Sequence, residues 1–227
     1  MEILFGSDLH MDKEAREAIA KASEKFKYTL VGGDIGLRRD EDPDRIVSYM
    51  RDTFHSEITY LTPGNHDFWP VNLVKLHYGP SNIHVVVDQK IPLYDPETNK
   101  VYSVWFSPWS TQFCDWNWMR DVSEDHYDIP EDIDFVVTHG PVRGILDKCP
   151  GGDNAGSEGL LGAIYRTKAK AVFSGHIHGY DYNHIKCYDI DWYNISVLDE
   201  HYRFKGSLPV FDTDTGTMRY LTEKDWS

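Results

Sequence analysis

Five short stretches of the chain carry aspartate, asparagine and histidine, residue types that bind metal ions through oxygen and nitrogen. They are Asp8-Leu9-His10, Gly33-Asp34, Gly64-Asn65-His66-Asp67, Thr138-His139 and Gly175-His176-Ile177-His178. Ligands of this kind suit first-row divalent cations, which activate water for hydrolysis. Each stretch holds only one or two candidate ligands. A polynuclear metal site therefore forms only if the fold brings all five stretches together.

Each stretch follows a short run with the composition of a β-strand. These runs are 2–5, 28–31, 58–61, 134–137 and 171–173. The spacing of apolar residues indicates helices over 13–26, 43–54, 68–78 and 157–168. Alternating strands and helices predict a parallel α/β sheet, in which ligands gather beyond the carboxyl ends of the strands. The sequence therefore places the candidate ligands on one rim.

The pattern changes after residue 80. Residues 83–87, 90–94 and 101–106 are predicted to be strands joined by turns, which indicates antiparallel pairing in a second sheet. Further strands are predicted over 193–198, 208–211 and 218–221, and residues 105–127 are crowded with aromatic side chains. We expect a single domain spanning residues 1–227, because a chain of this length has room for one substantial core.

Charge and cysteine content narrow the classes of partner and compartment. The net charge of −14 repels nucleic-acid backbones, so we expect a small anionic substrate and no long nucleic acid. Three irregularly spaced cysteines argue against a disulfide framework and for a reducing compartment. No apolar run approaches the roughly 18 residues of a membrane span, so we expect a cytoplasmic protein with no membrane contact.

The order D-x-H, G-D, G-N-H-D, H, G-H-x-H resembles the calcineurin-like metallophosphoesterase superfamily. Further stretches are similar to the metallophosphoesterase-domain branch, which is related to the class III cyclic nucleotide phosphodiesterases. They are Ser107-Pro108-Trp109, Thr138-His139-Gly140-Pro141, Gly144-Ile145-Leu146-Asp147, Gly159-Leu160-Leu161 and the segment from Asn194 to Tyr202. The resemblance covers nearly the whole chain and implies a four-layer α/β/β/α sandwich. Val142-Arg143 departs from the expected pattern of the branch, a proline followed by a neutral or aromatic residue.

The resemblance also implies roles for the candidate ligands. Asp34 would bridge two divalent metal ions, a role that one carboxylate can fill for cations about 3.5–4 Å apart. Asp8, His10 and His178 would complete the first site, and Asn65, His139 and His176 the second. Oxygen and nitrogen ligands favour Mn²⁺ or Fe, with Zn²⁺ as the alternative.

Other residues of the motifs and loops are predicted to act on the substrate or to support the turn. His66 is adjacent to a ligand and could protonate the leaving group, whereas Asp67 is expected to cap backbone N–H groups. Trp109 and Trp116 could stack on a base, and Arg143 could contact phosphate. Packing of the tryptophans in the core or a lid, and a solvated arginine, are the alternatives for these three residues.

We therefore expect a dinuclear metal-dependent phosphoesterase in which a hydroxide shared by two metal ions attacks phosphorus. A phosphodiesterase acting on cyclic nucleotides or similar small diesters is favoured. The first alternative is a phosphomonoesterase, although the G-D-x-x-D-R-G signature of protein phosphatases is missing after Asp34. The second alternative is a non-catalytic scaffold, which all seven occupied ligand positions argue against.

Overall fold

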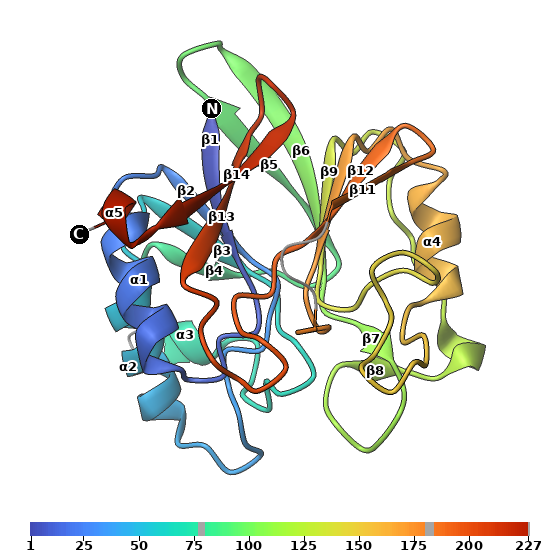
Figure 1. Ribbon diagram of the computed structural model, residues 1–227, viewed down its shortest axis with the longest axis horizontal. Coiled ribbons are helices and arrows are strands. Elements are labelled where there is room, and N and C mark those ends of the chain that lie inside the picture. Colours follow the sequence, from blue (N-terminus) through green and yellow to red (C-terminus); the bar gives the residue numbers. More distant parts are fainter. Residues whose placement is uncertain (77–79, 180–183, 227) are drawn as a thin grey trace.

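The computed structural model describes residues 1–76, 80–179 and 184–226 and contains two six-stranded sheets that face each other (Figure 1). The first sheet has the order β14-β13-β1-β2-β3-β4, and the second has the order β11-β12-β10-β9-β6-β5. Strands of the first sheet are β1 (Glu2–Gly6), β2 (Tyr28–Val31), β3 (Ile58–Leu61), β4 (Ile83–Val85), β13 (Ser207–Asp212) and β14 (Thr217–Thr222). Strands of the second are β5 (Gln89–Asp95), β6 (Lys100–Ser107), β9 (Phe135–Thr138), β10 (Ala171–Ser174), β11 (His184–Cys187) and β12 (Ile190–Asn194).

Helices cover the outer face of each sheet. On the first sheet lie α1 (Lys13–Ser23), α2 (Pro43–Thr53) and α3 (Leu73–Leu76), and on the second lies α4 (Glu158–Ile164) (Figure 1). A short C-terminal helix, α5 (Glu223–Trp226), packs against α1, and a small pair of strands, β7 (Ser110–Thr111) and β8 (Met119–Arg120), is followed by a 3₁₀ turn over Val122–Glu124. The predicted α/β/β/α sandwich is therefore confirmed.

The layers follow from the alternation of side chains along each strand. In β1, Leu4 packs with the helices of the first layer, whereas Ile3 and Phe5 point into the core between the two sheets. In β9, Val137 joins that central core, and Val136 packs outward in the cluster that contains α4. Both faces of these strands are buried, which is why their sequences are almost continuously apolar.

Polar side chains set the beginnings of the long helices. Asp12 accepts a hydrogen bond from the backbone N–H of Ala15 at 2.7 Å and caps α1. Asp42 caps α2, whose first residue, Pro43, has no N–H to satisfy. Ser157 caps α4 through the N–H of Leu160 at 2.8 Å.

Several predicted elements differ from the observed ones. The helix expected over 68–78 is confined to Leu73–Leu76 among the described residues, since Pro70 disfavours helix at the residue before it; residues 77–79 lie outside the described part. The strand at Ile83 pairs in parallel with β3 in the first sheet and does not join the antiparallel strands. The strand expected over 193–198 is β12, which ends at Asn194 because that side chain hydrogen-bonds Ile177 O and Ser196 N.

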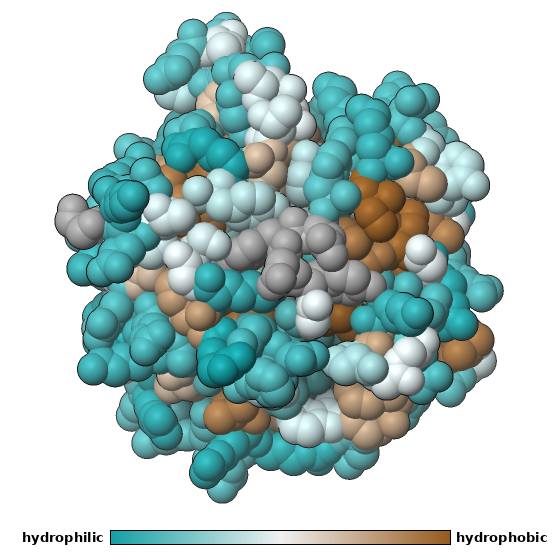
Figure 2. Space-filling view, in the orientation of Figure 1, coloured by the Kyte–Doolittle hydropathy of each residue, from teal (hydrophilic) through white to brown (hydrophobic). Residues whose placement is uncertain are grey.

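The helix expected over 157–168 ends at Ile164, and β7, β8, β11 and α5 were not predicted at all. Polar residues cover most of the face shown in Figure 2, as expected from the net charge of −14. No helix among the described residues is long and apolar enough to cross a membrane.

Candidate metal centre

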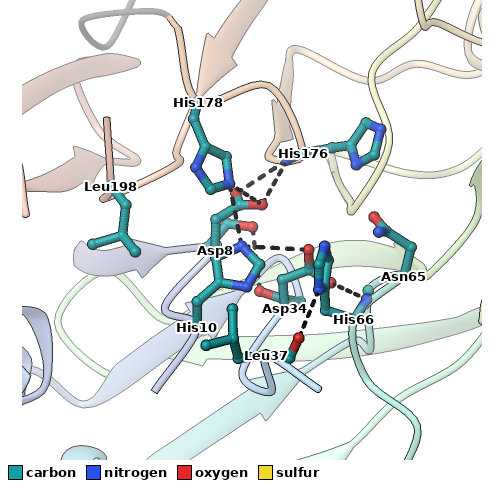
Figure 3. Close-up of polar contacts among 12 residues, drawn as sticks. Asp8, His10, Asp34, Leu37, Asn65, His66, His176, His178 and Leu198 are labelled. Carbon is teal, nitrogen blue, oxygen red and sulfur yellow. Dashed lines mark hydrogen bonds and ion pairs between the residues drawn. The ribbon is translucent and has the colours of Figure 1, made fainter. Parts of the chain in front are cut away.

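The candidate ligands converge because they follow parallel strands whose carboxyl ends meet at one edge of the molecule. β1, β2 and β3 run parallel in the first sheet, and β9 and β10 run parallel in the second. Backbone hydrogen bonds join the loops after these strands, from Asp8 N to Gly33 O at 2.9 Å and from Gly175 N to His139 O at 3.0 Å. The five predicted stretches therefore form one site; Figure 3 shows residues of four of them, and His139 joins them through contacts with Asp34 and Asn65.

The backbone of this site is held in an unusual conformation. Four candidate ligands have positive φ values: Asp8 (59°), His10 (44°), Asp34 (55°) and His176 (67°). Non-glycine residues adopt this left-handed region infrequently, at a cost of order 1–3 kcal/mol each, and such residues cluster at functional sites. The surrounding sheet therefore holds these side chains in positions that local preference would not select.

Side-chain donor atoms lie close together on both sides of Asp34. On one side, His178 Nε2 is 3.2 Å from His10 Nε2 and 3.3 Å from Asp8 Oδ1. His10 Nε2 in turn lies 3.6 Å from Asp34 Oδ2. On the other side, His139 Nε2 lies 3.5 Å from the same oxygen. A single Asp34 oxygen is thus within reach of two imidazoles from different sheets.

Asn65 and His176 complete the second side. The Asn65 Oδ1 atom is 2.7 Å from His139 Nε2. His176 is placed by its backbone, whose N–H donates to the Asp8 carboxylate at 3.0 Å. The His176 ring centroid lies 5.1 Å from that of His139, but among the described residues the His176 ring nitrogens belong to none of the three groups of donor atoms that could hold an ion.

Backbone carbonyls orient three of the imidazoles. His10 Nδ1 lies 3.0 Å from Gly36 O, His139 Nδ1 lies 2.8 Å from Gly32 O, and His178 Nδ1 lies 3.2 Å from Asp199 O. Because a carbonyl only accepts hydrogen bonds, each Nδ1 carries the proton and each Nε2 is left with a lone pair. This is the tautomer in which histidine binds a metal through Nε2.

Burial controls the electrostatics of the site. Burial lowers the pKa of His139 to about 4, that of His176 to about 3 and that of His10 well below its usual value, so all three are neutral at pH 7. Burial and the nearby negative charge of Asp8 raise the pKa of Asp34 well above its usual value. Burial also acts to raise the pKa of Asp8, but the His178 imidazole beside its carboxylate and the neighbouring imidazoles of His139 and His10 lower it overall.

The residues present match a model of a known family. The model described as calcineurin-like phosphoesterase matches residues 1–180. The chain belongs to the calcineurin-like phosphoesterase family. Family membership implies divalent metal ions, and the geometry above places the family's motifs in one site.

Known relatives of the family share part of the sequence or the whole fold. Metallophosphoesterase domain-containing protein 1 of human and mouse is 29% identical over 146 residues, covering 54% of this chain. That match covers 45% of the relatives, so the chain spans about half the length of the curated relatives it matches.

Two solved structures show the same fold across nearly the entire chain. The protein TT1561 of Thermus thermophilus has a TM-score of 0.64 and 13% identity, covering 97% of this chain and 98% of that one. A structure described as a novel archaeal phosphodiesterase has a TM-score of 0.51 and 15% identity, covering 98% and 99%.

The donor set fits the divalent ions that the family implies. The Asp8 and Asp34 side chains are buried, and among the described residues their ion-pair partners are imidazoles alone. Two carboxylates with no lysine or arginine partner are costly to bury in ionised form unless a cation is bound. Within the described residues, three overlapping groups could hold an ion: Asp8 with His10 and His178, Asp8 with Asp34 and His139, and His10 with Asp34 and His66.

His66 and Asp67 differ in what their side chains contact. His66 Nδ1 lies 3.1 Å from the Leu37 carbonyl, which leaves Nε2 available, and the ring packs on Trp116 with centroids 4.0 Å apart. Burial lowers the pKa of His66. Asp67 accepts hydrogen bonds from the backbone N–H groups of Gly36 and Gly64 and from the Trp69 indole. The expected role of Asp67 in capping backbone N–H groups is confirmed.

Two glycines of the motifs are required by close packing around the ligands. A Cβ atom on Gly64 would overlap Asp34 Oδ1 and the His139 ring, and one on Gly175 would overlap Ser7 and Asp8. No larger residue fits either position unless a candidate ligand shifts. This is the physical reason for glycine in the G-N-H-D and G-H-x-H stretches.

A cavity of about 640 Å³ opens beside the ligands. Its wall includes Trp116 and the 63%-exposed Phe113 from the loop between β7 and β8. Tyr202 forms another part of the wall, with its ring centroid 4.9 Å from those of both His10 and His178.

Two of the predicted substrate contacts do not line this cavity. The Trp109 indole N–H donates to Asp88 at 2.7 Å, and the Arg120 guanidinium lies over the Trp109 ring, so Trp109 packs beside the loop between β7 and β8. Arg143 donates to the carbonyl of Asn154 at 2.7 Å and is not among the residues that line the cavity. Of the three predicted contacts, only Trp116 faces the cavity.

Sequence reasoning missed several residues of the wall, chiefly Asp153, Glu200 and Tyr202, whereas Phe113 belongs to the aromatic stretch 105–127 already singled out. The segment from Asn194 to Tyr202 had been singled out as a family resemblance, but no role was assigned to its last residues. In the structure this loop stands out by its backbone, because Tyr202 has a positive φ of 58°. Such strain is visible only once the backbone is known.

Proposed function

We propose that this chain is a metal-dependent phosphoesterase that hydrolyses small phosphodiesters. The observation that carries the proposal is the pair of buried carboxylates, Asp8 and Asp34, facing imidazoles whose Nδ1 atoms are held by backbone carbonyls and whose Nε2 atoms converge between the sheets. Such a set binds cations and has no evident structural use without them.

We propose that the ligands form two groups, one on each side of Asp34. Asp8, His10 and His178 would hold one ion, Asn65, His139 and His176 the other, and Asp34 both. Oxygen and nitrogen donors favour Mn²⁺ or Fe, with Zn²⁺ as the alternative. When bound, two such ions lower the pKa of water and neutralise charge on the phosphoryl oxygens.

The chain's own residues position the substrate and supply a proton. His66 is proposed as the general acid in its imidazolium form, in which Leu37 O holds the Nδ1 proton and Nε2 carries a second proton for the departing oxygen; burial lowers the pKa of His66, which makes that form a stronger proton donor. Trp116, which packs on His66, offers a ring face to a base or another planar group. The preference for diesters, and for cyclic nucleotides among them, is supported by this apolar wall and by the missing phosphatase arginine after Asp34.

The test is hydrolysis by protein stripped with a chelator and then supplied with Mn²⁺, Fe²⁺ or Zn²⁺ separately. We expect no turnover after stripping, recovery with Mn²⁺ or Fe²⁺, and two ions per chain by elemental analysis. The panel comprises 2′,3′- and 3′,5′-cyclic nucleotides, aryl diesters, aryl monoesters and phosphopeptides. A kcat/KM for phosphopeptides above that for every diester would overturn the diesterase assignment.

The two tryptophans provide a matched test of base stacking. Trp116→Ala is expected to lower kcat/KM for a cyclic nucleotide roughly 5- to 150-fold, the effect of losing a contact of about 1–3 kcal/mol. An aryl phosphodiester should be little affected, because it has no base to stack. Trp109→Ala removes the same ring outside the cavity and should leave the ratio of the two substrates unchanged. Equal changes in both substrates for Trp116→Ala would show that this ring only supports the fold.

The remaining expectations about partners also stay predictions. The net charge of −14 supports a small substrate over long nucleic acid. A cytoplasmic location and the absence of membrane contact are predicted from the sequence.

A further inference from the structure

The wall of the cavity carries negative charge beyond the candidate ligands. Asp153 and Glu200 both line it, and none of the described lysines and arginines does. Cationic side chains are the usual partners of phosphate groups in proteins, because charge-assisted hydrogen bonds to phosphate are strong. A phosphate-ester site whose wall is aromatic and acidic therefore requires an explanation.

Four arginines around the site have their guanidinium groups bonded to other partners. The Arg39 guanidinium pairs with Asp115 at 3.3 Å, and that of Arg120 pairs with Asp88 at 3.2 Å. Arg203 follows Tyr202 in the chain but pairs with Asp199 at 2.7 Å. Together with Arg143, which donates to a backbone carbonyl, these side chains leave the substrate no guanidinium in the cavity.

Glu200 lies on a loop fixed to the ligands. The Asp199 carbonyl accepts the His178 Nδ1 hydrogen bond at 3.2 Å, and the Asp199 carboxylate accepts from the backbone N–H of His201 at 2.8 Å and of Arg203 at 2.9 Å. Tyr202 packs on the same His178 ring. The backbone at Glu200 is thus fixed relative to the ligands, and its exposed carboxylate lies 3.6 Å from the His201 imidazole.

We propose that Glu200 and Asp153 are specificity residues that select against negative charge beyond a single phosphodiester charge. The inference rests on the proposed function and names its substrate class: phosphodiesters whose second substituent is neutral or cationic. A monoester dianion brings a second charge toward both carboxylates, which repel it. A neutral or cationic substituent is accepted by the faces of Phe113, Trp116 and Tyr202.

The test uses three substrates with the same leaving group and different charge. They are p-nitrophenyl phosphate (a dianion), p-nitrophenyl phenyl phosphate (a monoanion) and p-nitrophenylphosphocholine (net neutral), assayed with Mn²⁺. Glu200→Gln and Asp153→Asn are each expected to raise kcat/KM for the dianion relative to the choline diester about fivefold, which corresponds to about 1 kcal/mol. In the wild-type protein, raising the salt concentration should also raise kcat/KM for the dianion relative to the choline diester, because both carboxylates are exposed and salt screens their repulsion.

The matched control is Glu57→Gln, which removes one charge from an exposed residue at the start of β3, the end of the strand away from the site. Its substrate ratios should equal those of the wild type. Ratios unchanged in the Glu200→Gln/Asp153→Asn double variant, or changed equally by Glu57→Gln, would overturn the inference while the phosphodiesterase proposal stands. Absence of hydrolysis of all three substrates by the metal-loaded wild type would overturn both.

Discussion

Replacing Asp34 by asparagine is expected to reduce kcat by at least about 10³-fold and to release metal from both sites. A single preorganised electrostatic contact is commonly worth about 10²–10³ in kcat. The loss of kcat expected for Asp34→Asn is larger, because Asp34 would serve both proposed ions. One of its oxygens lies 3.6 Å from His10 Nε2 and 3.5 Å from His139 Nε2. An amide supplies a neutral and weaker ligand. Elemental analysis and kcat for an aryl diester measure the two effects.

Asp95→Asn is the matched control for that substitution. Asp95 is also fully buried, but it lies at the far end of β5, where it accepts hydrogen bonds from Thr98 and the N–H of Glu97. This variant should lose some thermal stability and keep its metal content and kcat. If Asp34→Asn retained two ions per chain and near-normal turnover, Asp34 could not be the shared ligand.

His66→Ala is expected to keep two metal ions per chain while lowering kcat by about 10²–10⁴, the usual contribution of a positioned general acid. The expected loss depends on the leaving group, because an alkoxide needs a proton on departure and a nitrophenolate needs little. A series of diesters with leaving groups of increasing pKa should therefore give a steeper dependence of log kcat on that pKa in the variant than in the wild type.

The outcome for His66 also separates two roles in the same position. If the loss were equal for good and poor leaving groups, His66 would hold the phosphate and would not donate a proton. If metal content fell as well, His66 would be a ligand together with His10 and Asp34, as the third possible group of donors allows. His55→Ala removes an exposed imidazole outside the cavity and should change neither quantity.

Local sequence was sufficient to predict that the five stretches meet, because each of them is a local feature. Each candidate ligand stands directly after a buried apolar run, and the carboxyl ends of parallel strands meet at a sheet edge whatever the loops do. Gly64 and Gly175 belong to the same local motifs. Each lies beside a candidate ligand at a position where a Cβ atom has no space. Helix beginnings at Asp12, Asp42 and Ser157 were equally predictable, since a cap acts within three residues.

Only the tertiary structure decided which side chains line the cavity. Trp109 and Trp116 look alike in sequence, yet an acceptor at Asp88 holds the first outside the cavity, and the turn between β7 and β8 carries the second over His66. Arg143 was predicted to contact phosphate but donates to a backbone carbonyl and does not line the cavity, whereas Glu200, which had no predicted role, does line it. The physical reason is that a loop side chain is placed by partners distant in sequence, through hydrogen bonds and charge pairs that no local pattern contains.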